Sequence, residues 1–171
     1  QTCALPICRS FPVVVLGLIV ANCVVFVREL SLPPWESEAL IRSYSLIPSQ
    51  FTGFFAGEPF GLRAAVLPIF TSMFLHGGWM HLIGNMWFLW LYGDNVEDRT
   101  GHLGFLILYL IGGVVGGLAQ VYAAPDSSVP TLGASGAIAA VMGAYLITFP
   151  RARIYTLVPI IVYLARFELP A

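Results

Sequence analysis

Long apolar runs alternate with short polar clusters along this chain. The runs cover residues 11–30, 79–92, 101–124 and 133–149. A helix needs about 20 predominantly apolar residues to cross a bilayer, and it satisfies its own backbone hydrogen bonds there. The pattern therefore predicts about four complete transmembrane helices.

The first run, residues 11–30, could also be read as a secretory signal peptide. It is apolar apart from Asn22, Arg28 and Glu29 near its end. The run is long for the apolar region of a signal peptide, and no small-residue cleavage signal follows it. These features favour a first transmembrane helix.

The segment between the first two runs, residues 31–68, is long and interrupted by prolines. It also carries aromatic residues, namely Trp35, Phe51, Phe54, Phe55 and Phe60. A disordered linker is poor in aromatic residues, whereas Trp and Tyr gather at the membrane–water interface. We therefore expect a long loop that lies in the membrane interface.

The last apolar run, residues 154–165, is short for a span and contains Pro159. Runs of about 10–14 residues are typical of interfacial or re-entrant segments. The run also fits the start of a fifth helix, and both interpretations stay open.

The composition supports a membrane protein. Hydrophobic residues make up 58 % of the 171 residues, charged residues make up 10 %, and the mean hydropathy is +0.83. A soluble domain of this size cannot bury so much apolar surface. The expected fold class is an all-α, polytopic transmembrane helix bundle. The net charge of −1 gives no sign of a nucleic-acid partner.

The two ends of the chain affect its domain organisation. Residues 1–7 match one reading frame of a common sequencing adapter, which indicates an assembly artefact, although a genuine short N-terminus is the alternative. We expect one membrane domain over residues 8–171 that is truncated at its C-terminus. Arg9, Arg99, Arg151 and Arg153 then fit an N-terminus on the inner side of the membrane.

His81 and Asn85 stand four residues apart at the start of the second apolar run. At this spacing they share one face of a helix. Polar residues within membrane helices are candidates for functional sites, and hydrogen bonding between helices is the alternative. A zinc site would need a third ligand, but His102 lies beyond the other end of the helix. We predict no metal and no cofactor.

Ser135 begins the fourth apolar run, directly after a turn and between Gly133 and Gly136. The backbone N–H groups at a helix N-terminus are unsatisfied and lie at the positive end of the dipole. They can stabilise an oxyanion, and Gly136 leaves the hydroxyl uncrowded. A simple helix cap is the alternative interpretation.

Small residues recur at helical spacing in the last two long runs. They are Gly112, Gly113, Gly116 and Gly117 in the third run and Ala139, Ala140, Gly143 and Ala144 in the fourth. Such residues allow membrane helices to approach closely. We therefore expect close helix packing beside Ser135.

Three short motifs together resemble the rhomboid family of intramembrane serine proteases. The family's His-x4-His-x3-Asn, Gly-x-Ser-Gly and Glu-x-Arg motifs match His76, His81 and Asn85; Gly133, Ser135 and Gly136; and Glu97 and Arg99. Their order along the helices and the long aromatic loop after the first helix strengthen the resemblance.

The resemblance implies a mechanism and a set of roles. Ser135 would be the nucleophile, and its backbone N–H with the side chains of His81 and Asn85 would hold the oxyanion. His76 would line a hydrated cavity, and Glu97 would be structural. Gly133, Gly136 and Arg99 would also be supporting residues.

The sequence also departs from the family's pattern. The family's base is a histidine on a sixth helix. His102 is expected on the opposite membrane side from Ser135, and His81 is better placed but serves the family as an oxyanion donor. We therefore expect this chain by itself to be inactive. Some members carry Trp-Arg where this chain has Leu67 and Pro68, and some carry Tyr where it has Ala139.

The leading hypothesis for the complete protein is a serine-type intramembrane endopeptidase. Its partners would be the lipid bilayer and membrane proteins whose transmembrane segments it cleaves. A protease-dead relative that escorts membrane clients is the alternative, and a transport bundle is disfavoured because the polar residues gather near one membrane face. We expect a multi-pass protein of the bacterial inner (plasma) membrane.

Overall fold

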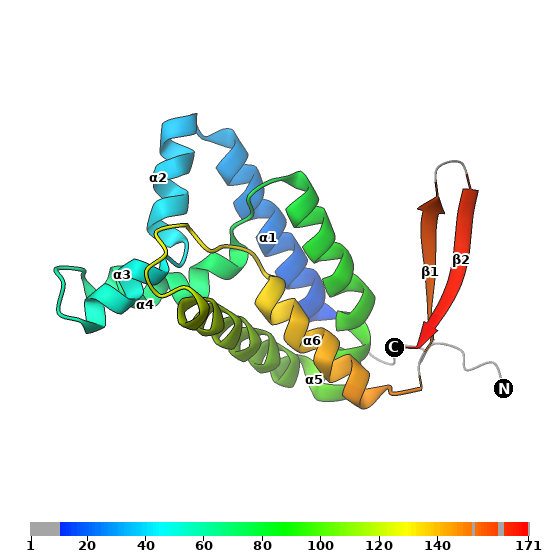
Figure 1. Ribbon diagram of the computed structural model, residues 1–171. Helices are drawn as coiled ribbons and strands as arrows, with labels where there is room; N and C mark the ends of the chain where they lie inside the picture. Colours follow the sequence, from blue (N-terminus) through cyan, green and yellow to red (C-terminus); the bar gives the residue numbers. More distant parts are fainter. Residues whose placement is uncertain (1–10, 152, 161–162, 171) are drawn as a thin grey trace.

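The computed structural model describes residues 11–151, 153–160 and 163–170. Its elements are α1 (Val13–Ser31), α2 (Pro34–Tyr44), α3 (Pro48–Phe55), α4 (Leu62–Thr71), the short 3-10 helix η1 (Ser72–Phe74), α5 (Trp79–Ala123), α6 (Ser135–Thr148), β1 (Arg153–Ile160) and β2 (Tyr163–Pro170) (Figure 1). The predicted adapter-derived segment, residues 1–7, lies outside the described residues.

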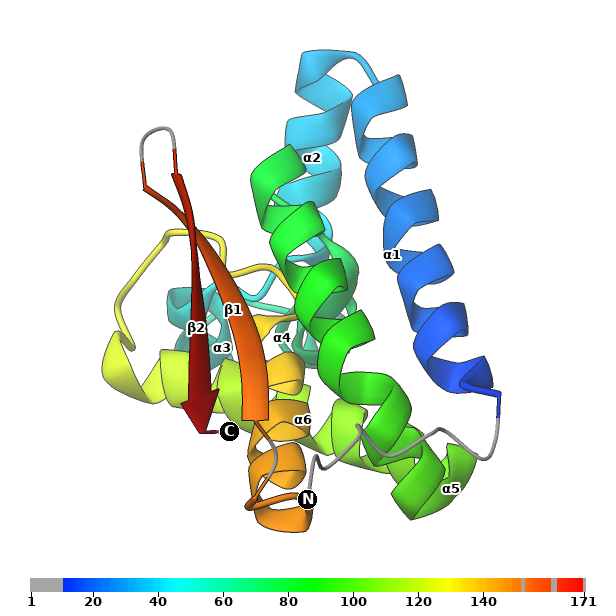
Figure 2. The ribbon, with the colours of Figure 1, turned by 90° about the vertical axis from the view of Figure 1, so that its right-hand side faces the viewer.

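The helix α5 is two apolar helices joined at a kink. Gly101 has a φ of 73° and a ψ of 163°, which is non-helical backbone that glycine adopts without strain. We call residues 79–100 the first arm and residues 102–123 the second arm, and the two arms run in different directions from the kink (Figure 2). With α1 and α6 they are the helices that the apolar runs predicted.

The interfacial loop predicted over residues 31–68 is largely helical. It holds α2, α3 and the first part of α4, and α2 and α3 each begin with a proline in the first turn. Proline suits this position because its ring fixes a helical φ and the missing N–H would have had no partner there. Trp35 and Phe55 are exposed, which agrees with a membrane interface.

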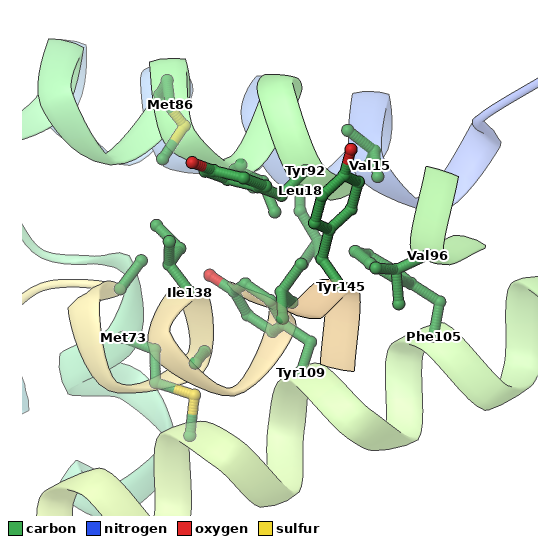
Figure 3. Close-up of a cluster of buried hydrophobic side chains, with 14 of the residues drawn as sticks. Val15, Leu18, Met73, Met86, Tyr92, Val96, Phe105, Tyr109, Ile138 and Tyr145 are labelled. Atoms are coloured by element: carbon green, nitrogen blue, oxygen red, sulfur yellow. The ribbon is translucent and has the colours of Figure 1, made fainter. Parts of the chain in front are cut away.

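One apolar core joins the helices. Figure 3 shows side chains from every spanning helix in this cluster, among them Val15, Leu18, Met86, Tyr92, Phe105, Tyr109, Ile138 and Tyr145. Large apolar side chains also remain exposed along the helices, including Val20, Trp87, Ile111, Val115 and Ile147. Such broad apolar surfaces suit a lipid environment, and the chain is an integral membrane protein.

Glycines set the packing distance between the second arm and α6. A Cβ added at Gly116 would lie 2.8 Å from the Cα of Gly136, and a Cβ at Gly112 would overlap the Cβ of Ala140. The two backbones are therefore in direct contact, as the small-residue pattern predicted. This contact requires a glycine at position 136, and this role of Gly136 was not predicted from the sequence.

Replacing Gly112 by alanine is expected to destabilise the bundle by about 1–3 kcal/mol, because the new methyl group must push α6 away from the second arm. Thermal unfolding of the purified protein in detergent, followed by tryptophan fluorescence, measures this change. Gly17→Ala is the control, since a Cβ at Gly17 meets nothing within 4 Å. If both variants unfold at the same temperature, the close contact is not important for stability.

The last described segments form a hairpin, and the expected start of a fifth helix is wrong for them. β1 and β2 pair in antiparallel register from Arg153 opposite Pro170 to Ile160 opposite Tyr163. The segment is rich in β-branched and aromatic residues, which favour strands. Pro159 would disrupt a helix, but it is tolerated in a strand that is an edge of its sheet.

Candidate active site

The connector between η1 and α5, residues 75–78, places His76 inside the bundle. His76 is 2 % exposed, and neither ring nitrogen has a hydrogen-bond partner among the described residues. Its ring stands edge-on to that of His81, with ring centres 5.1 Å apart. Burial, and to a lesser extent the neighbouring His81, lowers the pKa of His76 to about 4. His76 is therefore neutral near neutral pH.

His81 is oriented by the backbone that precedes it. The N–H of Gly77 donates a long hydrogen bond of 3.5 Å to its Nδ1. A ring nitrogen that accepts a hydrogen bond carries no proton, so a neutral His81 has its proton on Nε2. This tautomer makes Nε2 a hydrogen-bond donor.

Nε2 of His81 points at the loop that leads into α6. A Cβ added at Gly133 would lie 2.6 Å from this nitrogen, and Gly133 has a φ of 112°, where side chains are strained. Gly133 also donates a 2.8 Å hydrogen bond to the carbonyl of Ser72, which fixes the loop against η1. Glycine is thus required at this position by both its backbone conformation and the close approach of His81.

Asn85 lies one helical turn after His81 and faces the same loop. It is 8 % exposed, and its Nδ2 has no hydrogen-bond partner among the described residues. A Cβ at Gly133 would lie 3.6 Å from Nδ2. Two side-chain N–H donors therefore converge beside Gly133, and the Asn85 donor is buried without a partner, which is costly unless a ligand supplies an acceptor.

Ser135 is the first residue of α6 and is exposed. The N-cap is Ala134, and no side chain caps this end of the helix, so the interpretation of Ser135 as a helix cap is wrong. Its hydroxyl makes no hydrogen bond within the described part of the chain. The serine stands two residues beyond Gly133, at a helix N-terminus whose backbone N–H groups carry partial positive charge.

Glu97, near the end of the first arm that is distant from His81, binds the N-terminus of α1. Its carboxylate, which is 1 % exposed, accepts hydrogen bonds from the backbone N–H groups of Val14 at 2.9 Å and Val15 at 2.8 Å. These two donors at the start of α1 would otherwise be unsatisfied. Nδ1 of His102 contacts the same carboxylate, which places His102 at the opposite end from His81.

Arg99, the second residue of the Glu-x-Arg motif, is exposed. It makes no hydrogen bond or ion pair with another described residue. The structure thus gives Glu97 a structural contact and does not give Arg99 one.

Replacing Glu97 by glutamine is expected to destabilise the protein by about 1–3 kcal/mol, because an amide NH₂ would face a buried backbone donor. Glu38→Gln is the matched control, since Glu38 is exposed and pairs only with Arg42 one turn away. Exposed pairs of this kind contribute about 0–1 kcal/mol. Equal thermal stability of the two variants in detergent would contradict the capping role of Glu97.

One residue at the site end of the bundle was not predicted from the sequence. Glu29, near the end of α1, is 5 % exposed, and its Oε1 has no hydrogen-bond partner among the described residues. A carboxylate inside an apolar run was the signal that could have identified it.

No group of three or more histidine, cysteine or acidic side chains in the described residues could hold a metal ion. The arrangement instead offers a serine hydroxyl, helix N-terminal amides and two side-chain donors. This set can stabilise negative charge on an oxygen atom near Ser135.

Comparison with known proteins connects this arrangement to a family. The family model described as Rhomboid domain matches residues 63–169. The chain is 32 % identical over 121 residues to presenilin-associated rhomboid-like protein A, mitochondrial, of Danio rerio, covering 69 % of this chain and 31 % of that protein.

Two further relatives match shorter stretches. Rhomboid-like protein 11, chloroplastic, of Arabidopsis thaliana is 38 % identical over 68 residues, which are 40 % of this chain and 24 % of that protein. Rhomboid protease GluP of Bacillus subtilis (strain 168) is 40 % identical over 78 residues, which are 46 % of this chain and 15 % of that protein. The chain thus spans a third or less of the length of these curated relatives.

Proposed function

Because the chain belongs to the rhomboid family, we propose that the complete protein is an intramembrane serine endopeptidase that cleaves transmembrane segments of membrane proteins. The observation that carries this proposal is the convergence of the His81 and Asn85 side-chain donors on the loop that ends at exposed Ser135. A relative is named a rhomboid protease, which agrees with it.

In the proposed reaction, Oγ of Ser135 attacks the carbonyl carbon of the scissile peptide bond. The hydroxyl proton passes to a general base, and the carbonyl oxygen becomes an oxyanion. Nε2 of His81, Nδ2 of Asn85 and the backbone N–H of Ser135 donate hydrogen bonds to this oxygen. Preformed donors of this kind are worth far more in a site shielded from water than in bulk water.

Collapse of the tetrahedral intermediate breaks the peptide C–N bond, and the base returns its proton to the leaving amine. An acyl-enzyme on Ser135 remains. A water molecule, deprotonated by the same base, then hydrolyses this ester and restores the Ser135 hydroxyl.

The base is the group that the described site does not supply. His81 is assigned as an oxyanion donor, the buried ring of His76 packs against His81, and His102 contacts Glu97 at the other end of the bundle. We propose that a histidine from a segment beyond Ala171 provides the base, as the family resemblance implies.

The outer face of α6 has room for such a segment. Ser135 and Ala139 are exposed, and a Cβ added at Gly143 meets nothing within 4 Å. These positions follow one another at helical spacing down from the nucleophile. A helix packed on this face could approach closely and bring a histidine beside Ser135.

Reading the gene past Ala171 is the first test of this proposal. A further apolar helix with one histidine flanked by glycine or alanine would supply the missing base. A stop codon at that point, or a helix without histidine, would contradict the proposal and favour a protease-dead protein that escorts membrane clients.

The cellular membrane that contains the protein is also a matter for proposal. The sequence led to the prediction of a bacterial inner membrane. The relatives' names include a mitochondrial and a chloroplastic protein, and they do not support a bacterial membrane over an organellar one. Fractionation of the source organism's membranes with an antibody against the chain decides between them.

A further inference from the structure

A cavity of about 400 Å³ lies between α1, α2 and η1, where Val24, Val25 and Arg28 of α1 line it. The two helices meet at one end and diverge from there (Figure 1). The walls are formed chiefly by Val24, Val25, Leu40, Phe74 and Leu75. The volume is within the range of about 300–1,000 Å³ of ligand sites in proteins.

The exposed wall surface is almost entirely apolar, and its one charged residue is Arg28. The Arg28 side chain has no carboxylate partner among the described residues. Glu29 is buried on a different face of α1, and Glu38 pairs with Arg42. A positive charge in the last turn of α1 interacts favourably with the helix dipole. That interaction does not explain why an apolar cavity lies beside Arg28.

We propose that this cavity binds an anionic phospholipid, with an acyl chain in the cavity and the phosphate on Arg28. Water does not fill apolar cavities, whereas an integral membrane protein is always surrounded by lipid chains. The guanidinium group binds phosphate oxygens with two parallel hydrogen bonds. Exposed Trp35, seven residues after Arg28, marks the level of the lipid headgroups.

The size of the cavity favours a lipid chain over a substrate's transmembrane helix. A helix with its side chains is about 10–12 Å across, which is much wider than a single hydrocarbon chain. A single hydrocarbon chain is narrow and flexible enough to enter. The site is therefore distinct from the one that the proposed protease activity requires.

The cavity has a structural link to the candidate active site. Phe74 and Leu75 form part of its wall and directly precede His76 in the connector. A chain bound against them would stabilise the connector that positions His76 and orients His81. Lipid binding should thus raise the stability of this end of the bundle.

Native mass spectrometry of the complete protein in mild detergent, depleted of lipid, tests the proposal. Phosphatidylglycerol is titrated against phosphatidylcholine of the same acyl chains. We expect one molecule of phosphatidylglycerol to bind in preference to phosphatidylcholine. Arg28→Gln should weaken its binding about tenfold or more, since a charge-assisted hydrogen bond to phosphate is lost. Leu40→Trp, which fills the cavity, should remove the bound lipid whatever its headgroup.

Arg63→Gln is the matched control, because Arg63 is exposed on α4 and does not line this cavity. The proposal is overturned if Arg28→Gln binds phosphatidylglycerol as the unaltered protein does, or if Arg63→Gln weakens binding equally. Since Arg28 is exposed, its replacement should not prevent folding. The readout is lipid binding, so failure of the protease proposal would leave the result interpretable.

Discussion

Replacing Ser135 by alanine is expected to abolish both covalent labelling by a fluorophosphonate probe and peptide-bond cleavage in the complete protein. The probe forms a bond to an activated serine oxygen, and alanine has no such atom. Loss of the nucleophile in a serine protease lowers turnover on the order of 10⁶-fold. Gel fluorescence after labelling and cleavage of a reconstituted transmembrane substrate would both fall to background.

Ser128→Ala is the matched control for this result. Ser128 is an exposed serine in the turn before α6 and does not lie at a helix start. It should label and cleave as the unaltered protein does. Equal labelling of the unaltered protein and the Ser135→Ala variant would remove Ser135 from the mechanism, provided that both variants unfold at the same temperature.

Replacing His81 or Asn85 by alanine is expected to lower kcat by about 10²–10³-fold each, the usual effect of losing one oxyanion donor. The reason is their convergence on the Gly133 loop, where the Asn85 donor has no partner among the described residues. KM should change little, because the oxyanion exists only after attack. Initial rates in proteoliposomes over a range of substrate concentrations separate the two constants.

A second explanation for these residues, hydrogen bonding that only holds helices together, predicts a different result. In that case the alanine variants should unfold more easily, while the folded enzyme keeps its rate. Asn95→Ala is the control, since Asn95 is a buried asparagine on the same arm but near the Glu97 end. It should lower stability without affecting kcat, and a similar rate for Asn85→Ala and Asn95→Ala would argue against an oxyanion role.

Several features of the protein could be predicted from the sequence because they depend on local patterns. The apolar runs predicted α1, the two arms of α5 and α6, since a bilayer admits few other ways to satisfy the backbone. The spacing of four residues placed His81 and Asn85 on one face. The small residues predicted close helix packing, although not that the second arm and α6 would be the pair, and the motifs predicted the family.

Local patterns were less successful where two structures compete for the same residues. The segment after α1 was predicted as a loop because prolines break helices, yet Pro34 and Pro48 stand in first turns, where proline is favourable. The last apolar run was also compatible with the start of a helix, because apolar residues suit one, yet residues 153–160 and 163–170 form two paired antiparallel strands.

Only the tertiary structure decided the contacts between residues far apart in the chain. Glu97 binds the N–H groups of Val14 and Val15 across more than 80 residues. The ring of His81 lies against Gly133, and the cavity beside Arg28 is lined by residues from α1, α2, α4 and η1. Periodicity determines which face of a helix is buried, but the partner of each face depends on how all the helices pack together. The sequence therefore predicted the chemical groups of the candidate site, and the packing determined how they meet.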